Sequence, residues 1–232
     1  MAKKRDNLRK WKIMVICVLV AIPLIFLFLY YIYPLYILSE DEFEVYLREI
    51  VVGDLQLRKK ASAIVWDCPS ADKECQVNEI FRHVVENYKY YGDPRRGEFV
   101  QSVSDTKEVK GGDCEDLTIL LNSLLENIGI KTYLVLTADH AYSLACGLDI
   151  DRLQEEILES FRIRQEFYNG IYYPRFTKVD ITTVHYEIDD EVCVILDSTI
   201  GPLGYPGYDT QILGYKVAID PVTRKRVVLE KE

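Results

Sequence analysis

The stretch that decides the fold reads KGGDCEDLTILLNSLLENIGI and spans Lys110–Ile130. From position 117 onward its leucines and isoleucines recur at helical spacing, which predicts a helix with a buried apolar face. Asp113 is a good N-cap, Asp116 follows it at capping-box spacing, and Gly129 is placed to end the helix. We expect the glycine pair at 111–112 to form a sharp turn with positive φ angles before the helix begins.

Cys114 lies in the first turn of this predicted helix. The positive end of the helix dipole and the free N–H groups of the first turn both favour a thiolate. The thiolate is the reactive form of cysteine. Glu115 and Asp116 act in the opposite direction because they are negative, so a histidine is needed to take the thiol proton. The sequence therefore makes Cys114 a candidate nucleophile.

The N-terminus carries a basic tail followed by a long uncharged segment. Residues 1–12 hold six basic side chains and one acidic one, and residues 13–39 hold no charged side chain. That segment is longer than the roughly 20 residues that cross a bilayer and the roughly 7–15 of a cleaved signal peptide. Near its end it carries tyrosines typical of a membrane interface, namely Tyr30, Tyr31, Tyr33 and Tyr36. We interpret 13–38 as a single-pass transmembrane signal anchor, with the 1–12 tail in the cytoplasm and the rest outside the cell membrane.

Charge and cysteines agree with this placement. The chain has a net charge of −9 and its tail contributes six positive charges and one negative, so the remainder carries −14 and is a poor candidate for nucleic-acid binding. Cys68 and Cys75 flank a short polar loop, and we expect a disulfide between them in an oxidising compartment. Zinc binding is the competing interpretation, which the spacing and the lack of nearby histidines disfavour. Cys17 lies in the predicted span as a small apolar residue.

The chain after the span divides into a helical stalk and domain entry over 39–66 and a domain over 67–232. We expect helices over 39–53, 54–66, 77–89 and 150–168, and strands over 131–137, 140–148, 177–188 and 191–198. Residues 90–109 are expected to be irregular because glycine and proline interrupt them. This order predicts an α+β fold in which the cysteine-bearing helix packs on an antiparallel sheet.

Two of these strands carry the partners that a catalytic cysteine needs. His140 opens one strand and Asp197 ends another. If the strands pair antiparallel with His140 opposite Asp197, then Leu144 lies opposite Cys193 and the two polar groups meet at one end of the sheet. The same register places Cys146 diagonal to Cys193, as either a second disulfide or two buried thiols.

The chain has three histidines, so two remain as rivals. His83 is expected on the solvated face of the 77–89 helix. His185 is expected on the polar face of an edge strand, with no acidic strand end beside it. We therefore prefer His140 as the general base.

Three motifs resemble the transglutaminase-like superfamily: GGDCED at 111–116, DHAYSLA at 139–145 and VILDST at 194–199. The resemblance covers about 77–206 and implies a papain-like α+β core with a catalytic triad of Cys114, His140 and Asp197. Members include cross-linking transglutaminases, cysteine proteases and peptide:N-glycanases, and many prokaryotic members have no known substrate. The charged segment 150–168 departs from a minimal core of this family. We expect no cofactor and no metal.

The expected function is a membrane-anchored, extracytoplasmic cysteine peptidase or amidase that acts on a protein or peptide substrate. In that reaction His140 takes the thiol proton and returns it to the leaving amine, while Asp197 orients the imidazole. The backbone N–H of Cys114 would be one oxyanion donor. The alternatives are a protein cross-linking transglutaminase and a non-catalytic, membrane-tethered interaction module. The sequence sets no oligomeric state.

Overall fold

A computed structural model describes residues 2–27, 40–93, 99–137, 139–167, 181–208, 210 and 216–229. The chain divides into two compact units, Met1–Phe43 and Glu44–Glu232. The first unit contains helix α1 (Ala2–Leu27), which includes Pro23 and exposes apolar side chains between Met14 and its end. Helix α3 (Glu40–Glu49) spans the division between the units.

The predicted membrane anchor lies only partly within the described residues. Residues 13–27 form the second half of α1, whereas 28–38, with the tyrosines expected at the membrane interface, lie outside the described residues. Among the helices that the structure describes, none combines the length and the apolar character needed to span a bilayer. Anchoring therefore stays a prediction.

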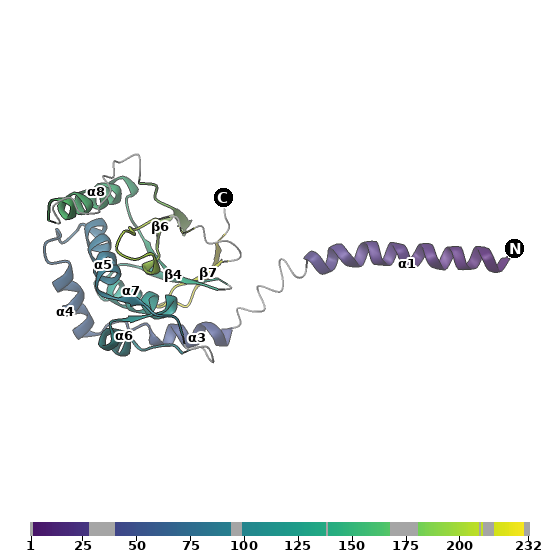
Figure 1. The fold of residues 1–232 in the computed structure, drawn as a ribbon, viewed down its shortest axis with the longest axis horizontal. Coiled ribbons are helices and arrows are strands. Elements are labelled where there is room, and N and C mark those ends of the chain that lie inside the picture. Colours follow the sequence, from purple (N-terminus) through teal and green to yellow (C-terminus); the bar gives the residue numbers. More distant parts are fainter. Residues whose placement is uncertain are drawn as a thin grey trace. The chain divides into compact units, whose positions relative to one another are not determined.

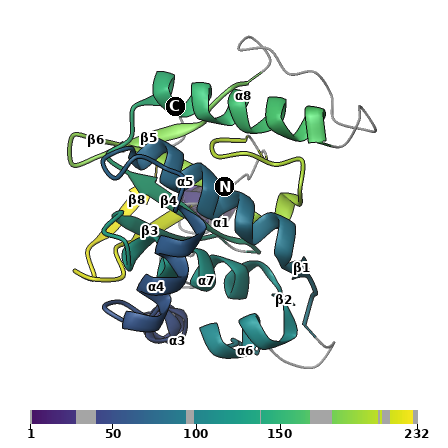
Figure 2. The same ribbon diagram turned by 90° about the vertical axis from the view of Figure 1, so that its left-hand side faces the viewer.

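The second unit is built from helices and strands in the α+β order, so the predicted fold class is confirmed at this level (Figures 1 and 2). Its helices are α4 (Leu55–Ile64), α5 (Lys73–Asn87), α6 (Val103–Val109), α7 (Cys114–Glu126), α8 (Ile150–Phe167) and the 3₁₀ turn η2 (Ser198–Ile200). Side chains of Asp54, Asp72 and Ser102 cap the N-termini of α4, α5 and α6. Helix α6 falls in the segment expected to be irregular, because a helix of two turns is too short to show clear periodicity.

Six strands form one antiparallel sheet in the order β5-β6-β4-β3-β7-β8. They are β3 (Thr132–Leu136), β4 (Ala141–Cys146), β5 (His185–Ile188), β6 (Glu191–Leu196), β7 (Lys216–Ile219) and β8 (Arg226–Leu229). A separate parallel pair consists of β1 (Lys89–Tyr90), which follows α5, and β2 (Gly111–Gly112), which directly precedes α7. The start of the predicted strand 177–188, through residue 180, lies outside the described residues.

Helix α7 packs against one face of the sheet, on β3 and β4, and is central to the unit (Figure 2). It also contacts α4, α5 and α6, so its side chains from Glu115 to Leu125 are all buried, polar ones included. The sequence predicted one buried face, whereas nearly the whole circumference of the helix is buried.

The opposite face of the sheet holds a second apolar cluster that includes Tyr133, Tyr142 and Ile195. Residues of the edge strands β5 and β8 are part of this cluster, so it extends across the whole width of the sheet. An ion pair between Lys225 in the β7–β8 turn and Asp189 in the β5–β6 turn links the two edge hairpins.

The β4–β6 register differs from the predicted one by two residues. Leu144 pairs with Ile195, and Cys146 lies directly opposite Cys193 instead of diagonal to it. The two cysteines form a disulfide with Cα atoms 4.0 Å apart, which decides between the two alternatives left open by the sequence. A shift of two residues keeps every side chain on the predicted face, so His140 and Asp197 still share one face.

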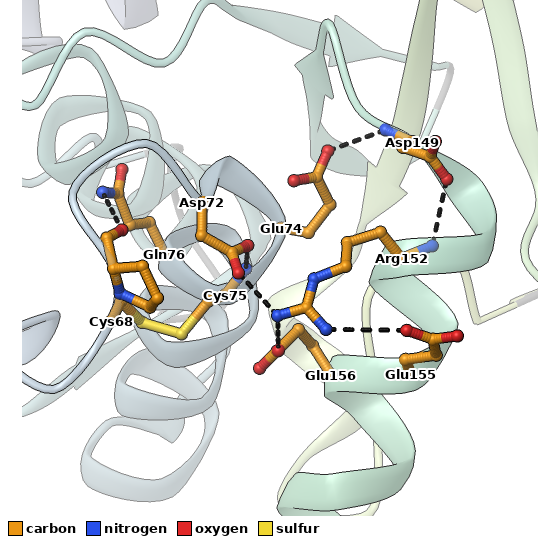
Figure 3. A network of polar contacts seen from close by, with 10 residues as sticks. Cys68, Asp72, Glu74, Cys75, Gln76, Asp149, Arg152, Glu155 and Glu156 are labelled. Atoms are coloured by element: carbon orange, nitrogen blue, oxygen red, sulfur yellow. Dashed lines mark hydrogen bonds and ion pairs between the residues drawn. A yellow bond between two sulfur atoms is a disulfide. The ribbon is translucent and has the colours of Figure 1, made fainter.

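The predicted Cys68–Cys75 disulfide is confirmed, and it lies beside a polar network that fastens α8 to the start of α5 (Figure 3). Arg152 of α8 contacts Asp72, the N-cap of α5, at 2.6 Å and also pairs with Glu156 on its own helix. Burial opposes ionisation of Asp72, but its bonds from Arg152 and the Cys75 N–H lower its pKa overall. Helix α8 is thus attached to the domain by both charge pairs and apolar contacts.

Candidate active site

The start of α7 is built as the sequence predicts. The Asp113 carboxylate accepts a hydrogen bond from the Asp116 backbone N–H at 3.4 Å, and the Asp116 carboxylate accepts one from the Asp113 N–H at 3.3 Å. This capping box makes Cys114 the first residue of the helix. Gly129 follows the helix with φ +85°, as expected for a residue that ends it.

The glycine pair before α7 has a different role from the predicted one. Neither Gly111 nor Gly112 has a positive φ angle, and Lys110 takes the left-handed conformation instead, with φ 56°. Both glycines pair with β1, and a Cβ on Gly111 would lie 2.3 Å from the Lys89 carbonyl oxygen. Small residues are required here because β1 approaches closely, and this pairing brings Tyr90 alongside Gly112.

His140 and Asp197 come together at the end of the sheet. The Nε2 atom of His140 lies 2.9 Å from an Asp197 carboxylate oxygen, while the other carboxylate oxygen accepts hydrogen bonds from the Thr199 N–H at 3.0 Å and hydroxyl at 2.7 Å. Burial of Asp197 opposes its ionisation, but these bonds outweigh burial and lower its pKa. The carboxylate is therefore ionised at neutral pH, and the imidazole has Nδ1 left for another partner.

Cys114 carries a free, half-buried thiol. The backbone N–H of Ala141, the residue after His140, is close enough to the sulfur to stabilise its anion. Helix α7 thus delivers the thiol to the start of β4, where His140 is attached. Of the three residues named from the sequence, His140 and Asp197 are in direct contact, and Cys114 lies beside Ala141, the residue that follows His140.

The electrostatic surroundings of the thiol differ from the expected ones. Burial raises the pKa of Cys114, and the neighbouring Glu115 raises it further by accepting the thiol hydrogen at 2.9 Å. Burial of the sulfur and its direct contact with the Glu115 carboxylate together outweigh the helix dipole, which would favour a thiolate. In the free protein Cys114 is a neutral thiol at neutral pH.

Negative charge surrounds the start of α7. Burial and the nearby Asp116 raise the pKa of Asp113 to about 6. Tyr90 is half exposed on β1, and burial, together with the negative charge of Asp113 and Glu115, raises its pKa. Among the described residues no group of three or more acidic, cysteine or histidine side chains could hold a metal ion.

The other two histidines lie apart from this set. His185 is exposed on the edge strand β5, as expected, and bonds the Thr183 carbonyl. His83 is half-buried instead of solvated, because it stacks near Tyr88 and packs within range of Lys60; burial, helped by Lys60, lowers its pKa to about 4.

Sequence reasoning missed three contributors to the site. Thr199 holds the Asp197 carboxylate, and its position two residues after an aspartate is a recognisable turn pattern. The Ala141 N–H and the Tyr90 hydroxyl carry no such signal. Each reaches the site through packing of segments that are distant in the sequence.

The described fold and site define an α+β protein with a thiol at a helix start and an imidazole–carboxylate pair on an adjoining antiparallel sheet. A family model described as "Transglutaminase-like superfamily" matches residues 63–168, and this segment of the chain is similar to that superfamily. The matched segment contains Cys114 and His140 and continues through α8, whereas Asp197 lies beyond it. Neither the curated proteins nor the solved structures give a significant match.

Proposed function

We propose that the chain is a thiol enzyme with a papain-like core that attacks amide bonds through Cys114, His140 and Asp197, as a cysteine peptidase or amidase. The observation that carries the proposal is the 2.9 Å contact between His140 Nε2 and the buried Asp197 carboxylate, in a domain that places a free thiol beside Ala141. Asp197 holds one imidazole nitrogen, so the other can exchange a proton with sulfur.

The reaction follows from these roles. His140 Nδ1 takes the thiol proton, the sulfur attacks the amide carbonyl, and the backbone N–H of Cys114 donates to the developing oxyanion. His140 then gives its proton to the leaving amine as the C–N bond breaks, which leaves an acyl thioester on Cys114. His140 then takes a proton from a water molecule, which attacks the thioester and releases the acid. An amine in place of water would give acyl transfer.

An acyl-trapping experiment tests the proposal. The full-length protein is incubated with a library of peptide amides, and the peptide that contains Cys114 is examined by mass spectrometry for added acyl mass. We expect an adduct that disappears in Cys114→Ala and forms about 10²–10⁴-fold more slowly in His140→Ala. The matched control is His185→Ala, which removes an exposed histidine and should leave the rate unchanged.

The same experiment separates the three functions. Added primary amine that appears in the product in place of water would indicate a cross-linking transglutaminase. Absence of both adduct and product across the library, with binding of peptides retained, would refute the enzyme and favour an interaction module.

We further propose that 13–38 anchors the enzyme in the cell membrane with the domain outside the cytoplasm. The support is the basic tail, the uncharged segment after it, the exposed apolar side chains of α1 and two disulfides, which are typical of oxidising compartments. Protease added to intact cells should remove the domain and leave the tail protected. Protection of the domain until the cells are lysed would contradict this orientation.

A further inference from the structure

Glu115 makes the contact that controls the state of the thiol. Glu115 is only 6% exposed, and one oxygen of its carboxylate accepts a hydrogen bond from Cys114 Sγ at 2.9 Å. A proton shared with Glu115 is not available to His140. The structure thus shows a thiol whose hydrogen is bonded to Glu115 and not to the base that the proposed reaction requires.

The groups that act on Cys114 leave Glu115 as the strongest specific influence. Burial acts first, the Glu115 hydrogen bond and charge follow, Asp113 on the same helix adds further negative charge, and only the Ala141 N–H acts in favour of the anion. Tyr90 of β1 lies within electrostatic range of this thiol, and His140 directly precedes the Ala141 N–H that bonds the sulfur. A carboxylate in contact with sulfur stabilises the neutral S–H form and repels the thiolate.

We propose that Glu115 is a positioning residue that holds Cys114 as a neutral thiol in the free protein, and that a hydrogen-bond donor of the substrate replaces the thiol at this carboxylate before attack. The inference rests on the proposed function and adds a control step to it. The donor would be an amide N–H or an ammonium group next to the reacting bond, since a carboxylate accepts from either.

The proton balance of this step is simple. In the free protein the S–H hydrogen bonds the Glu115 carboxylate. When the substrate N–H takes that carboxylate, the S–H turns toward His140 Nδ1 and the proton moves to the imidazole, which gives a thiolate and an imidazolium beside Asp197. If Glu115 were instead the general base, it would itself accept the thiol proton, and replacing Glu115 would lower the rate at which Cys114 reacts.

Alkylation of Cys114 by iodoacetamide distinguishes these roles because it needs no substrate. Rates are measured from pH 5 to 10 on the full-length protein by mass spectrometry of the Cys114 peptide, for wild type and Glu115→Gln. Glu187→Gln, which alters an exposed glutamate on β5, is the matched control. The midpoint of the pH–rate profile reports the pKa of the Cys114 thiol. Each unit by which this midpoint falls raises the thiolate fraction at neutral pH about tenfold and lowers the nucleophilicity of the thiolate about threefold, so the alkylation rate rises about threefold.

We expect Glu115→Gln to move the midpoint down and to accelerate alkylation at pH 7 by at least about threefold, with no change in Glu187→Gln. An unchanged or slower rate would overturn the proposal. Wild type provides a second measurement that needs no variant: its midpoint should lie above that of a free cysteine, about 8.5, and a midpoint at or below that value would also refute the inference.

A combined variant separates this inference from the proposed function. In Glu115→Gln/His140→Ala the released thiol has no imidazole to accept its proton. Loss of the gain seen in Glu115→Gln would support both proposals. A gain that persists without His140 would support the role of Glu115 and count against the triad.

Discussion

Removal of the Cys146–Cys193 disulfide should destabilise the domain more than removal of Cys68–Cys75. The bridges join residues 47 and 7 positions apart. The chain-entropy relation then gives contributions of about 4 and about 2 kcal/mol at 25 °C. Replacement by alanine also leaves a cavity at the first pair, since Cys146 and Cys193 are 1% and 0% exposed, which increases the difference.

The assay is guanidinium unfolding of the two double Cys→Ala variants beside the wild type, all as the full-length chain under oxidising conditions. The single variant Cys146→Ala should lose as much stability as its double variant, because one cysteine cannot form the bridge. Equal losses for the two double variants, or a larger loss for Cys68/Cys75, would refute the argument that the long loop dominates.

Three further predictions concern residues around α7. Asp113→Asn keeps the N-cap oxygen but removes a carboxyl whose pKa is 3.8 in the unfolded chain and about 6 in the folded protein. As the pH rises from 4 to 6, the unfolding free energy of the wild type should therefore fall by about 2–3 kcal/mol relative to that of the variant. Parallel pH profiles of the two proteins would contradict this. Asn122→Leu replaces a fully buried amide that has no hydrogen-bond partner among the described residues and should raise the unfolding free energy by about 1–2 kcal/mol, which denaturant titration measures; a lower value would show that the amide is paired. Gly111→Ala places a Cβ against the Lys89 carbonyl and should cost about 1–3 kcal/mol by the same titration, whereas an unchanged value would mean that β1 can move away.

Residues close together in the sequence were sufficient to predict much of this structure. The α7 capping box, the glycine after the helix and the Cys68–Cys75 bridge depend on residues a few positions apart, and each is as predicted. The shared face of His140 and Asp197 follows from the alternation of strands, which survives an error of two residues in the register.

The remaining features depend on contacts between distant segments. The conformation of Gly111 is decided by β1, more than twenty positions earlier, and not by any turn at the glycine itself. Likewise the state of the Cys114 thiol depends on how deeply it is buried and on which rotamer brings Glu115 to the sulfur. Sequence showed that Glu115 opposes the helix dipole, but only the packed structure shows which of the two is stronger.

Acylation of Cys114 by p-nitrophenyl acetate tests most directly the claim that Cys114, His140 and Asp197 act as one unit. Release of nitrophenolate is followed in wild type, His140→Ala, Asp197→Asn and the double variant, and Glu115 is unchanged in all four proteins. Loss of the charged hydrogen bond to the imidazole, about 1.5–3 kcal/mol, predicts a rate about 10–100-fold lower in Asp197→Asn, with the double variant no slower than His140→Ala alone. Equal rates in wild type and His140→Ala, or effects that multiply in the double variant, would contradict the account.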